Sequence, residues 1–161
     1  MQEVRFDDID ALRARAGEGF SPFGAEIEIS QSMINRFAEV TGDHQWIHVD
    51  LERARREGPF GATVAHGFLV LGLLPRLRVR PDLRITGYTN VINYGADRLR
   101  FTGPVRAGST VRARMRLVAV EPRDKGTLVK EEIEVVVAGP ETVALSYLMV
   151  VLYRGPRPAA P

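Results

Sequence analysis

The sequence contains no cysteine, only one tryptophan and only two lysines among its 161 residues. The lack of cysteine excludes a disulfide-linked scaffold, a thiol nucleophile, an iron–sulfur cluster and a cysteine-ligated zinc site. It is also typical of a reducing compartment, and we expect a cytoplasmic protein. Apolar runs such as residues 68–74 are far shorter than the roughly 20 residues that a membrane span needs. No membrane insertion is therefore expected.

An excess of charge of one sign is lacking too. The 22 basic and 20 acidic side chains leave a formal net charge of +2, which does not by itself indicate a nucleic-acid-binding protein. The arginines are scattered with little aromatic interleaving, so no nucleic-acid partner is expected. Apolar residues make up 45% of the chain, as in globular proteins. We predict a single domain over residues 1–161, with a core of about 20–153 and a flexible tail at 155–161.

The spacing of apolar residues predicts helices in the first half of the chain and strands in the second. We expect a short amphipathic helix within 1–16, a strand at 25–29, a helix that Ser30 or Ser32 caps and Gly42 ends, a loop over 43–49, and a helix over 51–57 that Asp50 caps. Strands are expected over 89–101 with a bulge or bend at Gly95, and over 111–117, 127–137 and 142–153. The three arginines within 111–117 alternate with apolar residues and are expected to face solvent.

Residues 65–74 leave no polar face, which predicts a helix buried on all sides. A buried strand is the alternative, but the leucines, the two glycines and the adjoining Pro75 favour a helix. The arginine-rich run at 76–80 is interpreted as a solvated helix end rather than a phosphate contact. Because strands and helices do not alternate along the chain, a parallel sheet is not expected. We predict an α+β fold in which an antiparallel sheet wraps around one central buried helix.

All three histidines, His44, His48 and His66, lie within a window of 23 residues beside this expected helix. An aspartate and a histidine that lie close together can hold one water and transfer its protons, and Asp43 and His48 can converge if their loop curls back. The first backbone N–H groups of the helix, near Gly67, suit an oxyanion that develops on a carbonyl. Such a set of groups can add water across a C=C bond conjugated to a carbonyl, or remove it.

Simpler roles for these residues stay open. Asp43 can be a cap or an Asx-turn residue, and His48 can be a hydrogen-bonded structural histidine. We expect His44 at the surface, His66 bonded to the backbone, and Trp46 as a packing or lid residue. The histidines lack the spacing of an H-E-x-x-H motif, so no metal site is expected. No G-x-S-x-G motif occurs, which argues against a Ser–His–Asp hydrolase.

Three segments, FAEVTGDHQWIHVD at 37–50, GPFG at 58–61 and VAHGFL at 64–69, together resemble the R-specific enoyl-CoA hydratase motif of the MaoC-like dehydratase family. The segment HQWIH, together with VINYG and RLRF within 91–101, is similar to the sequences of the nodulation-protein-N-like branch of that family. The resemblance extends over about residues 20–153. It implies a hotdog fold, in which an antiparallel sheet wraps around a long central helix, and usually a homodimer.

The resemblance also implies a chemistry. Asp43 and His48 match the catalytic pair of the family, which holds and activates a water. Gly67 matches the glycine whose backbone N–H receives the thioester oxygen. The implied reaction is the reversible hydration of a trans-2-enoyl-CoA to an R-3-hydroxyacyl-CoA. The family uses no metal and no redox cofactor, and coenzyme A or acyl carrier protein arrives only as part of the acyl-thioester substrate.

The sequence also departs from the common family pattern. Gln45 and Trp46 stand where the family most often has Asn-Pro before Ile-His, and we expect Trp46 to alter the loop or the pocket wall rather than the chemistry. With Trp46, the residues His66, Asn93 and Tyr94 are candidate substrate-binding residues. Two other functions stay open. They are a hotdog acyl-CoA thioesterase, which needs a carboxylate aimed at the thioester carbonyl, and a non-catalytic acyl-thioester-binding partner subunit.

Overall fold

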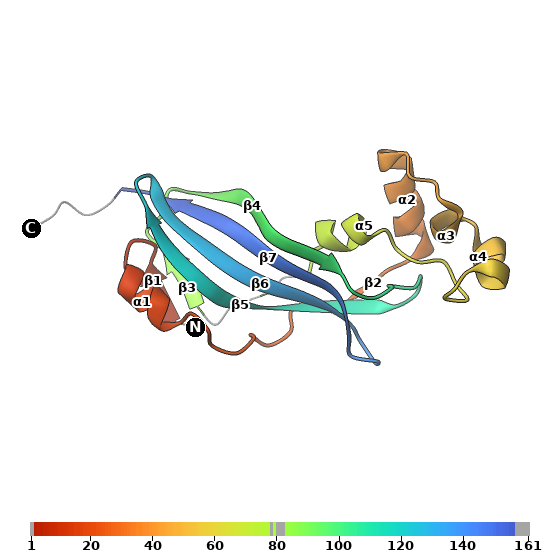
Figure 1. Cartoon of the computed structure of the whole chain (residues 1–161), viewed down its shortest axis with the longest axis horizontal. Helices are drawn as coiled ribbons and strands as arrows, with labels where there is room; N and C mark the ends of the chain where they lie inside the picture. Colours follow the sequence, from red (N-terminus) through yellow and green to blue (C-terminus); the bar gives the residue numbers. More distant parts are fainter. Residues whose placement is uncertain (1, 78, 80–82, 157–161) are drawn as a thin grey trace, which may run out of the picture.

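The computed structural model describes residues 2–77, 79 and 83–156 of the chain. Its largest feature is a five-stranded antiparallel sheet with the strand order β2-β5-β6-β7-β4, which curls around a short helix, α5 (Figure 1). The strands are β2 (Ile27–Glu28), β4 (Asn90–Phe101), β5 (Thr110–Arg123), β6 (Gly126–Val137) and β7 (Thr142–Arg154). The predicted antiparallel sheet and its hairpin turn between 137 and 142 are confirmed.

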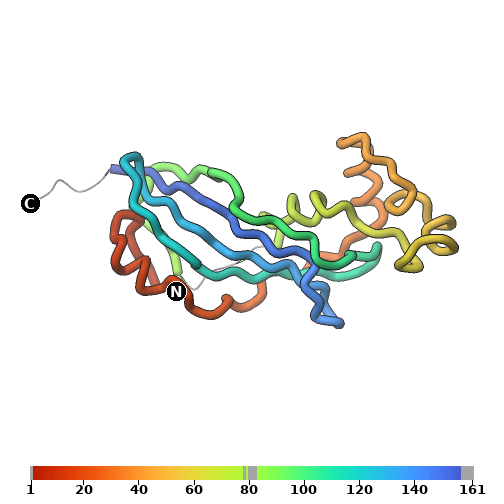
Figure 2. The backbone as a smooth tube through the Cα atoms, viewed as in Figure 1, coloured from red at the N-terminus to blue at the C-terminus, as the bar shows by residue number. Residues whose placement is uncertain are grey.

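Three helices project together beyond one end of the sheet, as the path of the chain shows (Figure 2). They are α2 (Gln31–Thr41), α3 (Trp46–Val49) and α4 (Leu51–Glu57). The Ser30 side chain accepts a hydrogen bond from the Met33 N–H, and Gly42 ends α2 with a φ of +76°, a left-handed conformation that glycine adopts without strain. The Asp50 side chain caps α4 in the same way. Both predicted helices are confirmed, whereas the loop expected over 43–49 contains α3.

The central helix differs from its prediction in length and in burial. α5 spans Gly67–Gly72, and turns continue the chain to Leu77. Leu69, Val70 and Leu73 are buried against the concave side of the sheet. Phe68, in contrast, is 63% exposed. The prediction of a helix buried on all sides is therefore wrong for the isolated chain, because one curled sheet covers only one side of an apolar helix.

The N-terminal residues form a small unit of their own. The strand β1 (Gln2–Arg5) pairs in parallel with β3 (Leu83–Thr86), and α1 (Ile9–Ala14) follows β1. The prediction placed only a helix within 1–16 and no strand at 83–86. This unit has its own buried cluster, which consists of Val4, Leu12, Leu83 and Val120. The core therefore extends beyond the predicted range of 20–153. Among the described residues, no helix is long and apolar enough to cross a membrane.

The strand β4 lies at an edge of the sheet and is irregular. It pairs with β7, and the register shifts between Asn93 and Gly95 and again between Ala96 and Arg98. The irregularity predicted at Gly95 is confirmed. The opposite edge of β4 pairs with no other described strand. Apolar and aromatic side chains are exposed along it, and Tyr94 is 66% exposed. An uncovered strand edge of this kind is a template for pairing with another chain.

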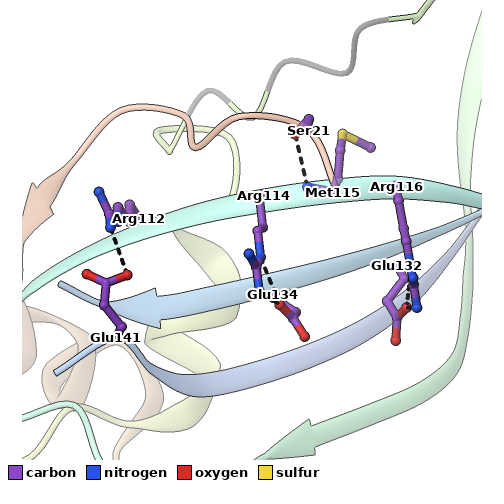
Figure 3. Close-up of polar contacts among 8 residues, drawn as sticks. All are labelled: Ser21, Arg112, Arg114, Met115, Arg116, Glu132, Glu134 and Glu141. Atoms are coloured by element: carbon purple, nitrogen blue, oxygen red, sulfur yellow. Dashed lines mark hydrogen bonds and ion pairs between the residues drawn. The ribbon is translucent and has the colours of Figure 1, made fainter. Parts of the chain in front are cut away.

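The convex face of the sheet carries a ladder of ion pairs (Figure 3). In this ladder Arg112, Arg114 and Arg116 of β5 pair with Glu141, Glu134 and Glu132, at distances of 2.7, 2.7 and 2.6 Å. Their guanidinium groups also lie over the rings of Phe20 and Phe23. The predicted alternation along β5 is confirmed. The arginines, however, are partly covered rather than free in solvent, because residues 17–25 run along the outer edge of β5 through irregular backbone hydrogen bonds.

The concave face contains one buried carboxyl group. Glu131 of β6 is 9% exposed, and it forms no hydrogen bond or ion pair with another described residue. Burial disfavours the charged form of the group, and it raises the pKa of Glu131 from 4.5 to about 7. The folded chain therefore holds a proton on Glu131 over a pH range in which the unfolded chain releases it.

We expect the free energy of unfolding to fall as the pH rises from about 4.5 to about 7, the interval between the two pKa values. The expected loss is on the order of 3 kcal/mol, fully present above pH 7. Urea unfolding between pH 5 and pH 8 measures it, and Glu131→Gln should remove most of the slope. The same dependence of the free energy of unfolding on pH in the wild type and in the variant would contradict this prediction.

Candidate functional site

His48 lies on α3 with its ring buried against the segment that precedes α5. Its Nδ1 is 2.7 Å from the carbonyl oxygen of Val64. A carbonyl oxygen only accepts hydrogen bonds, so Nδ1 carries the proton and donates. In the neutral ring the lone pair then lies on Nε2. The fold thus fixes the ring and leaves one nitrogen free to accept a proton.

His66 is the residue directly before α5, and it connects the two halves of the site. Its Nε2 donates to the backbone carbonyl of Asp43 at 3.0 Å, and the same nitrogen lies 3.9 Å from Asp43 Oδ2. Its ring stacks on that of His48, with 3.8 Å between centroids. The expected bond from His66 to the backbone is confirmed. Because His66 contacts both residues, it holds the Asp43 loop over the His48 ring.

Asp43 follows the end of α2, and its side chain is 53% exposed. Its Oδ1 accepts from the Gln45 N–H at 3.3 Å, so the Asx-turn role considered for this residue is also present. One ligand atom each from Asp43, His48 and His66 lies within 4.8 Å of the others. A single water can bridge groups at this separation. Three such groups could equally approach a metal ion, and the expectation of no metal stays a prediction.

Gln31, in the first turn of α2, is a positioning residue that the sequence analysis did not identify. Its Nε2 donates to the backbone carbonyl of His48 at 2.8 Å, and its Oε1 accepts from the Thr63 hydroxyl at 2.5 Å. The Val64 N–H donates to the Ile47 carbonyl alongside. Together these hydrogen bonds hold α3 against residues 63–64. No sequence signal identifies this role, because a glutamine at the start of a helix is usually solvated.

Gly67 is the first residue of α5, so its N–H has no partner within the helix. A Cβ at this position would lie 2.7 Å from the ring of Phe101 at the end of β4, closer than real Cβ contacts allow. Glycine is thus the residue that fits here. A cavity of about 370 Å³ opens beside Gly67. Its apolar lining includes Phe60, Val64, Val70, Phe101 and Val105.

The remaining predicted residues lie around or apart from this cluster. Trp46 begins α3, and the Arg53 guanidinium lies 4.4 Å from its ring centroid. His44 is exposed, as expected. Asn93 and Tyr94 lie in the middle of the exposed edge strand β4. No hydrogen bond, ion pair or ring contact within the described residues joins them to the histidines, and their assignment as substrate-binding residues stays a prediction.

The chain combines a curled antiparallel sheet over a central helix with an aspartate and two histidines that lie together at the start of that helix. It belongs to the MaoC-like dehydratase family, because residues 18–139 match the MaoC like domain. It is 49% identical over 125 residues to 3-hydroxyacyl-thioester dehydratase Z of Mycobacterium tuberculosis, over 76% of this chain and 80% of that protein. It is 46% identical over 114 residues to Nodulation protein N of Rhizobium meliloti, over 71% and 68% of the two chains.

The fold has solved counterparts. The (R)-hydratase from A. caviae superposes with a TM-score of 0.66 at 20% identity, and the match covers 87% of this chain and 98% of that one. The predicted α+β hotdog class is thereby confirmed. The resemblance to the MaoC-like dehydratase family and its nodulation-protein-N-like branch is confirmed as well.

Proposed function

We propose that this chain is a hydro-lyase that interconverts a trans-2-enoyl thioester and an R-3-hydroxyacyl thioester. The observation that carries the proposal is the gathering of Asp43, His48 and His66 within 4.8 Å, directly before the first N–H groups of α5. The relative at 49% identity is a 3-hydroxyacyl-thioester dehydratase, which supports the same reaction. Sequence, site and family thus agree on hydration and dehydration.

Each group has a role that its geometry suits. The thioester oxygen accepts a hydrogen bond from the Gly67 N–H, which stabilises the enolate by about 3 kcal/mol. A water held between the Asp43 carboxylate and His48 attacks C3. As the new C–O bond forms, a proton leaves the water for the free Nε2 of His48 or for Asp43, and a proton is returned to C2. Dehydration follows the same steps in reverse.

The experiment is a hydration assay with crotonyl-CoA and with a longer 2-enoyl-CoA. It follows the absorbance of the conjugated thioester, and we expect this absorbance to fall. Unchanged absorbance with both substrates would contradict the proposal. Release of free thiol would instead indicate a thioesterase, and binding without a spectral change would indicate a non-catalytic subunit. We propose that no metal or redox cofactor takes part, so dialysis against a chelator should leave the rate unchanged.

We further propose a homodimer that forms through β4. Two features support this proposal: the unpaired edge of β4, and exposed apolar side chains near it. A partner chain would pair the edge and bury these side chains, which are Phe68, Val91, Tyr94 and Phe101. Light scattering should give twice the mass of 17.9 kDa. Tyr94→Asp at the strand edge should shift the mass toward the monomer. A monomeric wild type at micromolar concentration would contradict the dimer.

The location of the protein in the cytoplasm stays a prediction.

Gln31→Leu should lower kcat about 10-fold, because small displacements of reacting groups have effects of this size. The substitution removes both of the side-chain hydrogen bonds through which Gln31 holds His48 and Thr63 in position. Asn35→Ala is the matched control, since Asn35 accepts from the same Gln31 nitrogen but only at the surface. Steady-state kinetics with crotonyl-CoA would decide. Equal kcat values for the two variants would show that Gln31 does not position the site.

A further inference from the structure

A second cavity, of about 440 Å³, lies over the concave face of the sheet near the end of β7. It is separate from the cavity beside Gly67. Ala144 of β7 lines the first cavity and Tyr153 of the same strand lines the second, so about 30 Å of strand lies between them. The proposed reaction at Asp43 and His48 uses no group of this second cavity.

Polar groups without partners face this second cavity. Glu131 lines it and is 9% exposed, with no hydrogen bond or ion pair to another described residue. The Tyr153 hydroxyl forms no hydrogen bond with a described residue either, and Arg15 Nε is buried without a partner. A buried carboxyl group without a partner is rare in native proteins, and here it lies at the same cavity as a half-buried hydroxyl group that also has none. The arrangement therefore indicates an occupant that supplies their partners.

The charges around the cavity favour an uncharged occupant. The Arg15 guanidinium is paired with Glu18, and that of Arg84 is paired with Glu3, each at 2.9 Å. An anionic ligand would find no free guanidinium among these two, and a cationic ligand would have to approach both. A metal ion would find two carboxyl groups in the lining, Glu131 and Glu18, and Glu18 is already paired with Arg15. Burial raises the pKa of Glu131 to about 7, so near neutral pH this carboxyl group can donate as well as accept a hydrogen bond.

The rest of the lining is apolar and consists mainly of Val79, Leu83, Ile85, Met115 and Leu117. We propose that the second cavity binds an alkyl chain that ends in an uncharged hydroxyl group, with Glu131 and Tyr153 as its hydrogen-bond partners. A hydroxyl group both donates and accepts, which matches this set of groups. An alkyl chain without oxygen would leave Glu131 and Tyr153 unpaired.

Two kinds of molecule can supply such an alkyl chain. One is a free alcohol, and the other is the substrate, whose acyl group would carry the hydroxyl at its far end. The second source rests on the proposed function and on the proposed dimer. Two β4 edges paired about a two-fold axis run antiparallel, so the start of β4 in one chain lies beside the end of β4 in the other. Tyr88 precedes β4 and lines the second cavity, whereas Phe101 ends β4 at Gly67. The second cavity of one chain would then adjoin the catalytic loop of the other.

The test compares three substrates: crotonyl-CoA, trans-2-decenoyl-CoA and 10-hydroxy-trans-2-decenoyl-CoA. We expect the wild type to prefer the hydroxylated C10 substrate in kcat/KM by about 3- to 10-fold, the value of one hydrogen bond to an uncharged group. Glu131→Leu and Tyr153→Phe should each reduce this preference. Both variants should hydrate crotonyl-CoA at the wild-type rate, because a C4 chain does not reach the cavity.

Calorimetric titration with octan-1-ol separates the two sources. If octan-1-ol competes with the C10 substrates but not with crotonyl-CoA, the occupant is the acyl chain. If it binds in a Glu131-dependent way without any C10 preference, the occupant is a free alcohol. No preference together with no binding, or tighter binding of octan-1-amine or octanoate, overturns the proposal. A wild type that hydrates none of the three thioesters would refute the proposed function, while the titration with octan-1-ol would still show whether the second cavity binds an alcohol.

Discussion

Asp43→Asn and His48→Gln are each expected to lower kcat for the hydration of crotonyl-CoA by about 10²- to 10⁴-fold, the usual contribution of a positioned acid or base. The asparagine keeps the shape of the side chain but cannot take a proton. The glutamine removes the ring nitrogen that lies free in His48, together with the Nδ1 bond to Val64. Steady-state kinetics at pH 7 would measure both losses.

The matched control for this pair is His44→Gln. His44 lies in the same loop as Asp43, but it is exposed and outside the cluster of ring nitrogens. It should retain nearly the wild-type rate. Unfolding curves should show that Asp43→Asn folds normally, since Asp43 is half exposed. Near-wild-type turnover in both Asp43→Asn and His48→Gln would refute their assignment as the catalytic pair.

Gly67→Ala is expected to lower kcat by about 10²- to 10³-fold, the usual effect of losing one oxyanion donor. The added methyl group would lie 2.7 Å from the Phe101 ring, so either the ring or the start of α5 must move. A shift of the helix start displaces the Gly67 N–H, which we propose as the donor to the thioester oxygen. KM for crotonyl-CoA should change less than kcat, because the donor acts mainly on the charge of the transition state.

Two further variants isolate the cause of this effect. Gly72→Ala lies in the same helix, where a Cβ would meet nothing within 4 Å. It should retain full activity and gain stability of up to about 1 kcal/mol. The double variant Gly67→Ala with Phe101→Ala should recover much of the lost rate, because the clashing ring is gone. If Gly67→Ala is as active as the wild type, the helix start does not supply the oxyanion donor.

The elements that the sequence predicted well have local signals at their ends. Ser30 and Gly42 bound α2, and Asp50 caps α4, and each signal acts within a few residues of the helix. Alternation of apolar and charged residues identified β5 in the same way. The gathering of Asp43 and His48 could be anticipated because the motif lies in one continuous stretch. These features depend on neighbouring residues alone.

The features that were missed depend on distant partners. β1 has four residues and pairs with β3, about 80 positions later in the chain, so no local pattern reveals either strand. Gln31 acquires its role only when α2 meets residues 48 and 63. The exposure of Phe68 depends on how far the sheet curls. Glu131 was likewise not singled out, because a glutamate in an alternating strand is expected to face solvent.

The pairing of β1 with β3 has a consequence for the order in which the chain folds during synthesis. β1 is translated well before its partner strand β3, which ends at Thr86. α1, which follows β1, contacts β5, which ends at Arg123. At about 5–20 residues per second, the ribosome releases the end of β5 roughly 6–24 s after β1. During that interval the first residues are an open target for proteases and chaperones, and the second cavity lacks the wall that this N-terminal unit provides.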